Sequence, residues 1–334
     1  MPADRSPVPD VSAIVVTWDG WSLTRRAIQS LYAEEDAQSL RLEVIVVDNN
    51  STDETPEALP ALFPRARYLR LDGNYGFAIA NNRALPLATA PLIVLFNNDA
   101  VAQRGALRAL VDAARAAPDF AIFAPQMIQL RRPSLVDNRG LYLDASTHIR
   151  QIDTGTPVSV RRDLCEVFGA SAGACLLRRE VMDHIGLFDE SLGTYWEDCD
   201  FALRARAAGY RCLYVPDAHV LHEGSATTER MGDWKLYHIH RNMPVVCRRW
   251  LPFRARRLSS WLWVARELYY VVRGVATGRG RTVLRAKRDA WRHPTGPWRV
   301  TPEQRARLEA WLGVKARPAT IRSADQGRAV RSAS

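Results

Sequence analysis

Three acidic residues lie within four positions of one another, directly after two large aromatic residues: Glu197, Asp198 and Asp200 follow Tyr195 and Trp196. Carboxylates at the start of a helix cap it and complement its dipole, which accounts for Asp200 and in part for Glu197. Capping does not explain the aromatic pair. An aromatic wall beside a carboxylate is typical of a sugar-binding cleft, in which Asp198 would act as the general base that removes a proton from a hydroxyl group.

A second polar cluster, Asn97, Asn98 and Asp99, follows an apolar run, and His222 follows another. Ligands of open α/β sheets bind at the carboxyl ends of the strands, so these positions are expected to face a ligand. One carboxylate is few for a cation site, but a hard cation completes its shell with phosphate oxygens and water. Two other interpretations stay open, because Asn-Asn-Asp is also typical of a turn and a lone histidine is more often a packed side chain than a ligand.

The elements that position these clusters follow from the alternation of apolar runs and helical patterns in the first hundred residues. Four runs are predicted strands: Ser12–Thr17, Glu43–Val47, Arg67–Leu71 and Leu92–Phe96. Apolar residues at helical spacing separate the first strand from the second and the third from the fourth, which predicts βαβ units and a mostly parallel sheet. Each predicted strand ends in a polar cluster, and four such clusters in phase are more than turn chemistry explains: Thr17–Gly20, Asp48–Asp53, Asp72–Phe77 and Asn97–Asp99.

The second hundred residues continue with helices and strands of less regular order. The pattern predicts helices at Ala106–Ala117, at Arg179–Ile185 and from Glu197 to about Ala208, and strands at Phe120–Leu130 and Tyr210–Pro216. Residues 131–163 are polar and contain proline and glycine, which favours a variable excursion over the site.

Composition sets the broad class of the protein. The 334 residues are 47% hydrophobic, as in an ordinary globular protein, and show no repeat at a fixed period. The five cysteines form no C-x-x-C pair, which favours reduced thiols. The polar start, MPADRSPVPD, does not resemble a signal peptide, and no apolar run reaches the roughly 20 residues of a spanning helix. We therefore expect a cytoplasmic address.

The net charge of +10 is unevenly distributed along the chain. Residues 1–229 hold 22 Lys and Arg against 30 Asp and Glu, whereas residues 230–334 hold 24 against 6. Such a basic segment suits a membrane surface, a lipid diphosphate or a nucleic acid, although a solvated tail is the simpler interpretation. No nucleic-acid motif accompanies it, so no nucleic-acid partner is expected. The predicted helix Leu258–Val275, rich in Trp and Tyr, is expected either to lie on an anionic membrane surface or to pack on the catalytic domain.

Taken in order, the motifs resemble those of a known family. They are Val15-Val16-Thr17, Val46 to Asp53, Asn74-Tyr75-Gly76-Phe77-Ala78 with Asn81-Asn82, Leu95 to Asp99, and Tyr195 to Asp200. Together they look like family 2 glycosyltransferases of the GT-A fold, especially the rhamnosyltransferase-like bacterial branch, over roughly residues 11–250. This resemblance implies an α/β fold with a Rossmann-like mixed sheet flanked by helices, followed here by a basic helical extension.

The resemblance also implies roles for single residues. Asp198 would be the catalytic base, with Tyr195, Trp196 and Glu197 on the acceptor side, and Asp99 with His222 would hold Mg²⁺ or Mn²⁺. The donor nucleotide sugar would be bound by Thr17, Asp48, Asn74, Gly76, Asn82 and Asn98. Two positions depart from the family pattern: Asn97 replaces the first acid of the D-x-D metal motif, and Asp19 stands where an asparagine is usual.

From these inferences we expect a disordered N-terminus at 1–10, a catalytic domain at 11–229, a basic helical extension at 230–314 and a disordered tail at 315–334. Within the catalytic domain, 11–100 would be the nucleotide-binding half and 101–229 the acceptor-binding half. The expected reaction is inverting transfer from a nucleotide sugar, dTDP-rhamnose before a UDP-sugar, to a saccharide or lipid-linked acceptor in cell-surface polysaccharide synthesis. The enzyme would be cytoplasmic, with peripheral contact to the inner face of the membrane.

Alternative functions belong to other classes. A catalytically inactive nucleotide-sugar-binding module of the same fold is the main one. An NAD-dependent oxidoreductase is disfavoured, because Thr17-Trp18-Asp19-Gly20 stands where a G-x-G-x-x-G loop would follow the first strand.

Overall fold

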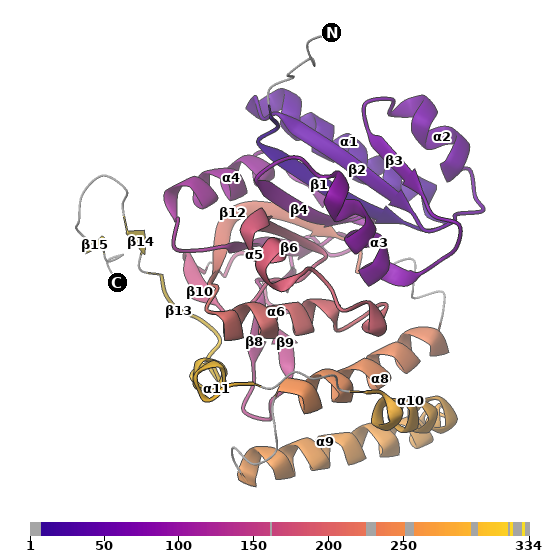
Figure 1. Cartoon of the computed structure of the whole chain (residues 1–334), viewed down its shortest axis with the longest axis vertical. Coiled ribbons are helices and arrows are strands. Elements are labelled where there is room, and N and C mark those ends of the chain that lie inside the picture. Colours follow the sequence, from indigo (N-terminus) through magenta and orange to yellow (C-terminus); the bar gives the residue numbers. More distant parts are fainter. Residues whose placement is uncertain are drawn as a thin grey trace.

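A mixed sheet with helices on both faces forms the centre of the computed structural model, which describes residues 8–160, 162–224, 232–250, 257–294, 300–319, 321–322 and 329–330 (Figure 1). The main strand order is β3-β2-β1-β4-β11-β6-β12-β10-β13. β1 pairs in parallel with β2 and β4, and β12 with β6, whereas β11 runs antiparallel to β4 and β6. The expected mixed α/β sheet is therefore confirmed.

The strands of this sheet have the following bounds: β1 Val11–Thr17, β2 Leu42–Asp48, β3 Arg67–Arg70, β4 Leu92–Asn97, β5 Ala100–Ala102, β6 Ile122–Gln129, β7 Val136–Asn138, β10 Cys165–Val167, β11 Ala174–Arg178, β12 Cys212–His222 and β13 Arg317–Pro318. β1 is buried over its whole length, because helices cover both faces of the sheet at its centre. The four strands predicted in the first hundred residues are confirmed to within one residue at each end.

Helices α1 Trp21–Gln38, α2 Thr55–Leu62 and α4 Ala106–Ala116 share one apolar core with the sheet, and α3 Gly76–Ala84, α5 Arg179–Ile185 and α6 Glu197–Ala208 lie on the other face. Residues 131–163 form β7 and the hairpin β8 Leu141–Leu143 with β9 Ile149–Gln151. The predicted helix at Arg179–Ile185 is confirmed. None of the helices in the described part of the chain has the length and apolarity needed to cross a membrane.

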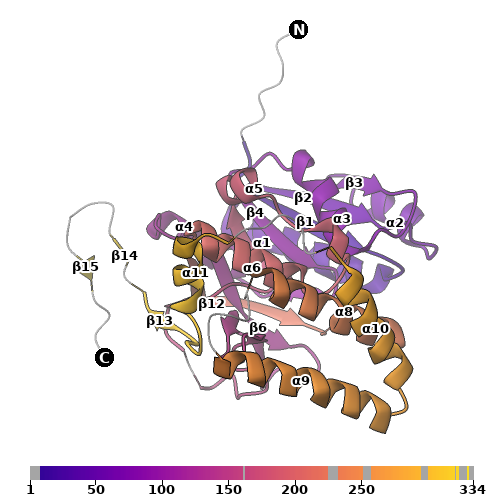
Figure 2. The same ribbon diagram turned by 60° about the horizontal axis from the view of Figure 1, so that its bottom comes forward.

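The extension consists of α8 Asp233–Trp250, α9 Arg257–Ala276, α10 Gly280–Arg292 and α11 Pro302–Glu309. α8 and α11 lie beside α6 (Figure 2). Apolar residues of α6, α8, α9, α10 and α11 form one continuous buried cluster, to which α9 contributes Trp263, so the extension shares its core with the catalytic domain. The expected boundary between residues 229 and 230 falls in 225–231, outside the described residues.

A buried carboxylate connects α6 to α8. Asp200 is fully buried, and its Oδ2 accepts a hydrogen bond from Nε of Arg204 at 2.8 Å. Its Oδ1 accepts from Nε1 of Trp250 at 2.9 Å and from Nη1 of Arg249 at 3.3 Å. The capping role considered for Asp200 is wrong, because Trp196 occupies the N-cap position and no side chain caps this helix.

The tail expected to be disordered from residue 315 needs a correction for its first residues. Arg317–Pro318 form β13 and pair with Cys165 and Glu166 of β10, since the edge of the main sheet offers unpaired backbone groups there. At the other end, residues 1–7 lie outside the described residues, whereas Asp10 is ordered by ion pairs with Arg41 and Arg115.

Replacing Asp200 by alanine is expected to lower the free energy of unfolding by about 3–5 kcal/mol, because the guanidinium groups of Arg204 and Arg249 would lose a buried counter-charge. Urea denaturation measures this change. Asp112→Ala is the matched control, since the half-exposed pair of Asp112 with Arg108 on α4 should contribute no more than about 1 kcal/mol. Equal effects of the two substitutions would show that Asp200 does not hold α8 to α6.

Candidate active site

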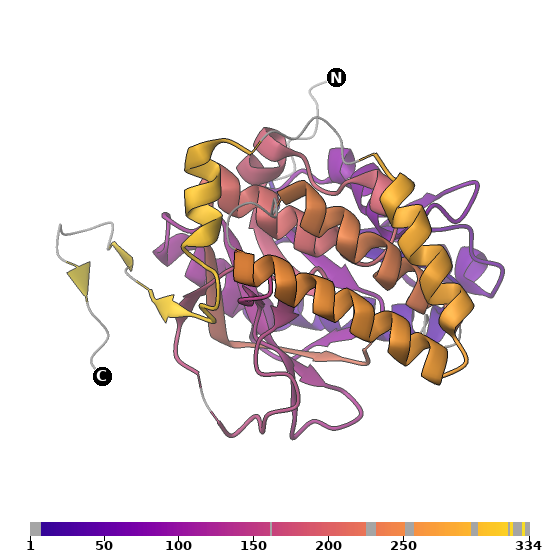
Figure 3. The same cartoon turned by 90° about the horizontal axis from the view of Figure 1, so that it is seen from below.

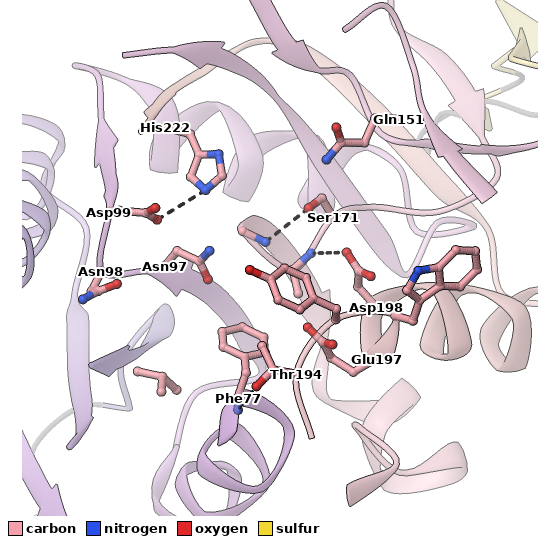
Figure 4. Close-up of a pocket in the computed structure, with 15 residues that line it drawn as sticks. Phe77, Asn97, Asn98, Asp99, Gln151, Ser171, Thr194, Glu197, Asp198 and His222 are labelled. Carbon is pink, nitrogen blue, oxygen red and sulfur yellow. Dashed lines mark hydrogen bonds and ion pairs between the residues drawn. The ribbon is translucent and has the colours of Figure 1, made fainter. Parts of the chain in front are cut away.

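A pocket opens at the carboxyl ends of β1 and β4, where the sequence predicts polar clusters that face a ligand. Figure 4 shows Asp99 and His222 on one side of it and Glu197 and Asp198 on another, with Asn97 between. The lining residues are Val16, Phe77, Asn97, Asn98, Asp99, Gln151, Ser171, Ala172, Gly173, Thr194, Tyr195, Trp196, Glu197, Asp198 and His222. Six of the predicted site residues from the acceptor, base and metal groups therefore meet in one pocket, together with the predicted donor residue Asn98.

The pairing of β5 with β12 brings Asp99 and His222 together. His222 is opposite Ala100 in this antiparallel pair, and its Nε2 lies 3.3 Å from Oδ1 of Asp99. Its Nδ1 lies 3.1 Å from Oδ2 of Asp137 on β7. Burial alone would lower the pKa of His222, but the hydrogen bonds and charges of Asp137 and Asp99 raise it to about 10. The ring is thus held between two carboxylates.

Asn97 completes this side of the pocket. Its side-chain Oδ1 is buried and has no hydrogen-bond partner among the described residues. A methyl group on Gly173 would come within 3.5 Å of Nε2 of His222 and 3.6 Å of the Asn97 amide nitrogen, so the absence of a side chain at Gly173 leaves room between them. Asn97, Asp99 and His222 line the same pocket, and a side-chain amide, a carboxylate and an imidazole form a donor set that suits a divalent cation.

Asp198 and Glu197 form the acidic side. One carboxylate oxygen of Asp198 accepts from its own helix at the amide of Cys199, at 2.8 Å, and the other accepts from the amide of Ala172, at 3.4 Å. Burial raises the pKa of Asp198, and burial with the nearby Asp198 charge raises the pKa of Glu197 well above its usual range. Oε2 of Glu197 is buried and has no hydrogen-bond partner in the described part of the chain. The two carboxyl groups therefore titrate as a pair, and the hydrogen bonds to Asp198 favour its ionised form.

Tyr195 and Trp196 hold a strained backbone just before these acids. Their φ angles are 70° and 73°, a left-handed conformation that costs a non-glycine residue roughly 1 kcal/mol or more. The aromatic wall expected from the sequence is only partly available, because Trp196 is buried and stacks on His148 with ring centroids 5.2 Å apart. Burial lowers the pKa of His148 to about 3, with further lowering by Arg266, so the stacked ring is neutral.

A single side chain of the extension braces this strained turn. Nδ2 of the fully buried Asn242 on α8 donates to the carbonyl oxygens of Leu192, Thr194 and Tyr195 at 2.8, 3.0 and 2.7 Å. These contacts fix the segment that leads into Asp198. The extension therefore takes part in shaping the pocket.

A second pocket adjoins the first and shares Val16, Phe77, Asn98 and Thr194 with it. Three more of the predicted donor-binding residues line it, Thr17, Asn74 and Gly76. Gly76 has a φ of +84°, and a methyl group there would lie 3.1 Å from Oγ1 of Thr194 and 3.3 Å from the backbone of Gly193, so only glycine allows this close approach.

Two predicted donor residues do not line either pocket. Asp48 is fully buried and accepts hydrogen bonds from the hydroxyl of Tyr68 at 2.7 Å and the amide of Ser51 at 2.8 Å. The side-chain amide of Asn82 exchanges hydrogen bonds with the backbone of Phe188, at 2.9 and 3.1 Å. In this structure both side chains form hydrogen bonds that stabilise loops next to the pockets.

Several residues that line the two pockets or contact their walls were not predicted from the sequence. Asn49 follows Asp48 in the same polar cluster and was within reach of that argument, and Trp18 follows Thr17 in the same way. Asp137, Gln151 and Trp234 come from the excursion and the extension, where no local pattern marks them. Asp19, to which no role was given, joins the ends of β1 and β2, since its Oδ1 accepts from the amide of Thr52 at 2.6 Å.

Comparison with known proteins agrees with this geometry. The family model "Glycosyl transferase family 2" matches residues 12–186. An N-acetylglucosaminyl-diphospho-decaprenol L-rhamnosyltransferase of Mycobacterium tuberculosis is 28% identical over an alignment 277 residues long, which covers 73% of this chain and 84% of the relative.

Two solved structures share the fold at lower identity. GalNAc-T7 with UDP, GalNAc and Mn²⁺ gives a TM-score of 0.61 at 14% identity, covering 91% of this chain and 55% of that one. The mannosyltransferase PcManGT of Pyrobaculum calidifontis with GDP-Man and Mn²⁺ gives a TM-score of 0.51 at 19% identity, covering 92% and 87%.

Replacing Asn242 by leucine is expected to lower the free energy of unfolding by about 1–3 kcal/mol, because three buried carbonyl oxygens would lose their donor. Hydrogen exchange at the amides of residues 193–196 should become faster. Asn242→Asp keeps the shape but replaces the amide donor with an acceptor, so it should be at least as disruptive. Unchanged exchange in both variants would contradict the bracing role.

Proposed function

We propose, since this chain belongs to glycosyl transferase family 2, that it moves a hexose from a nucleoside-diphosphate sugar to a hydroxyl group with inversion at the anomeric carbon. The chain is a glycosyltransferase; its donor, acceptor and stereochemistry are the proposed part. The observation that carries the proposal is the joint pocket, in which Asp198 faces the Asp99–His222 pair beside a second pocket lined by Thr17, Asn74 and Gly76. That arrangement suits a base on the acceptor side and charge compensation on the side of the leaving diphosphate.

For the donor we favour dTDP-L-rhamnose, with a UDP-sugar next. The support is the printed name of the mycobacterial relative, an L-rhamnosyltransferase of which this chain covers 84%. The same name supports a lipid-linked saccharide as acceptor, consistent with a role in cell-surface polysaccharide synthesis.

Asp198 would act as the general base. As the acceptor oxygen forms its bond to C1 of the sugar, its proton passes to the Asp198 carboxylate, and the bond between C1 and the diphosphate oxygen breaks with both electrons leaving on the nucleoside diphosphate. The amides of Ala172 and Cys199 hold the carboxylate in place during the transfer. Glu197 is buried beside it.

Asp99, His222 and Asn97 would hold Mg²⁺ or Mn²⁺. No complete cluster of three His, Cys, Asp or Glu ligands occurs among the described residues, so the shell requires the Asn97 carbonyl and phosphate oxygens of the donor as well. When bound, such a cation neutralises the charge of the departing diphosphate. Asp137 fixes the orientation of His222 by its contact with Nδ1, the arrangement usual for a ligand histidine.

Asp198→Asn is expected to reduce turnover by roughly 10²–10⁴-fold while donor binding stays near normal, because the amide cannot accept the proton. The kcat of the wild type should rise with pH through a pKa above that of an ordinary aspartate, since burial raises the pKa of Asp198 and only the ionised form is active. Transfer to a saccharide acceptor measures both. Glu197→Gln, which keeps the shape of the neighbouring acid, is the matched control and should affect turnover far less. Near-normal turnover of folded Asp198→Asn would contradict the assignment of Asp198 as the base.

Removal of divalent cations by EDTA is expected to abolish transfer, and Mg²⁺ or Mn²⁺ should restore it. Asp99→Ala should weaken nucleoside-diphosphate binding when the cation is present and leave binding unchanged without it, because the carboxylate acts through the cation. Calorimetric titration of the diphosphate with and without Mn²⁺ separates the two cases. Full activity in excess EDTA would mean that the change to Asn97 has removed the need for a cation.

A further inference from the structure

Helix α9 exposes one continuous apolar face. Trp261, Val264, Leu268, Val272 and Val275 follow one another at spacings of three and four residues and therefore lie along one stripe. Four of them are largely exposed: Trp261 at 72%, Leu268 at 60%, Val272 at 66% and Val275 at 61%. α9 forms the outermost layer of the molecule on this side, as the view from below shows (Figure 3).

The inward face of the same helix is mixed. Trp263 is buried in the core that α6 and α8 share, and Tyr270 packs against that core. Nη1 of Arg266 lies 3.3 Å from the carbonyl oxygen of Ser146, and the Glu267 carboxylate pairs with Nζ of Lys287 on α10 at 2.5 Å. α9 and α10 approach closely, since a methyl group on Gly274 would come within 2.8 Å of Val283. A surface helix normally buries its apolar residues, so the outward stripe of α9 is apolar surface that its packing on the protein does not cover.

The exposed charges on α9 and α10 have one sign. Residues 257–294 contain nine Lys and Arg but only two acids. Glu267 pairs inward with Lys287, and Asp289 accepts from Tyr237 and from Arg288. Around the apolar stripe the exposed arginines of the described residues are Arg273, Arg279, Arg281, Arg285, Arg288 and Arg292, and two further apolar side chains, Leu284 and Trp291, lie exposed on α10.

We propose that the α9–α10 face binds an anionic membrane surface, with α9 lying in the interface and its stripe inserted among the lipid chains. The apolar stripe with a basic surround has the composition of helices that bind at the interface. A second copy of the chain is a poorer occupant, because a twofold contact through this face would oppose two sets of arginines. A nucleic acid would compensate the charges of the arginines but would leave the aliphatic side chains of the stripe exposed to water.

A chain of contacts connects this face with the pocket. Arg266 holds Ser146 in the loop between β8 and β9, and His148 of the same loop stacks on Trp196 next to Glu197. A membrane bound at α9 thus lies against the part of the protein that carries the acceptor side. The inference that this brings a lipid-linked acceptor to Asp198 rests on the proposed function, whereas the membrane contact does not.

The test is co-sedimentation of the full chain with phosphatidylcholine vesicles, with and without phosphatidylglycerol, at low and high salt. Binding should require the anionic lipid, weaken steeply with salt and leave a salt-resistant remainder from the inserted side chains. Arg281→Gln, Arg285→Gln and Arg288→Gln together should lower the partition coefficient roughly 100-fold, since each arginine near the surface contributes about fivefold. Trp261→Ser, Leu268→Ser and Val272→Ser together should remove the salt-resistant remainder.

Matched controls lie on the catalytic domain. Leu62→Ser removes an exposed apolar side chain from α2, and Arg25→Gln with Arg104→Gln and Arg132→Gln removes three exposed arginines; neither variant should change vesicle binding. Equal, negligible binding to both kinds of vesicle overturns the proposal, and so does unchanged binding of the triple serine variant. Stronger salt-dependent binding to duplex DNA than to the anionic vesicles would assign the face to nucleic acid. Donor hydrolysis in vesicle-free solution should be normal in all these variants, so its loss would bear on the proposed function and not on the membrane contact.

Discussion

The buried carboxylate of Asp200 is the constraint on which the arrangement of this protein depends. It compensates the charges of Arg204 on its own helix and Arg249 on α8, and it accepts from the indole of Trp250. Because these groups are out of contact with water, α6 and α8 are bound to one relative position by electrostatics as well as by their apolar core. Asp198 lies two residues earlier and lines the pocket. The start of α6 therefore carries one acid that binds α8 and another that is the candidate base.

The strained backbone at the start of α6 is stabilised by side chains that contact it directly. Two left-handed residues, Tyr195 and Trp196, bring the chain into α6, and such a conformation persists only when the surroundings determine it. Asn242 provides three contacts to that turn from α8, and His148 provides a stacking partner for Trp196 from the β8–β9 loop. The extension therefore contributes to the site through geometry, even where its side chains do not reach the pocket.

The pocket separates two kinds of charge. On one side burial raises the pKa values of Glu197 and Asp198, which suits a carboxylate that must accept a proton. On the other side Asp99 and Asp137 enclose His222, and Asn97 lines the same pocket. This separation matches a displacement in which a proton is lost at one end and a diphosphate leaves at the other.

The sequence by itself determined the elements and the residues that follow them. Continuous apolar runs and helical periodicity are local signals, so the strands up to Leu92–Asn97 and helix Arg179–Ile185 were predicted closely. Thr17, Asn98, Asp99 and His222 were predicted for the site because each lies at or after the end of a predicted strand, and Asp198 because it belongs to an acidic cluster that follows two aromatic residues. Only the tertiary structure decided which side chains meet across long separations: Asp137 with His222, Asn242 with the 192–195 turn, Asp200 with Arg249, and the inward turn of Asp48. Such partners depend on packing between elements, which leaves no periodic trace along the chain. The same is true of α9, whose pattern fits a packed helix and a membrane-bound one equally well: the structure buries Trp263 and exposes Trp261, Leu268 and Val272.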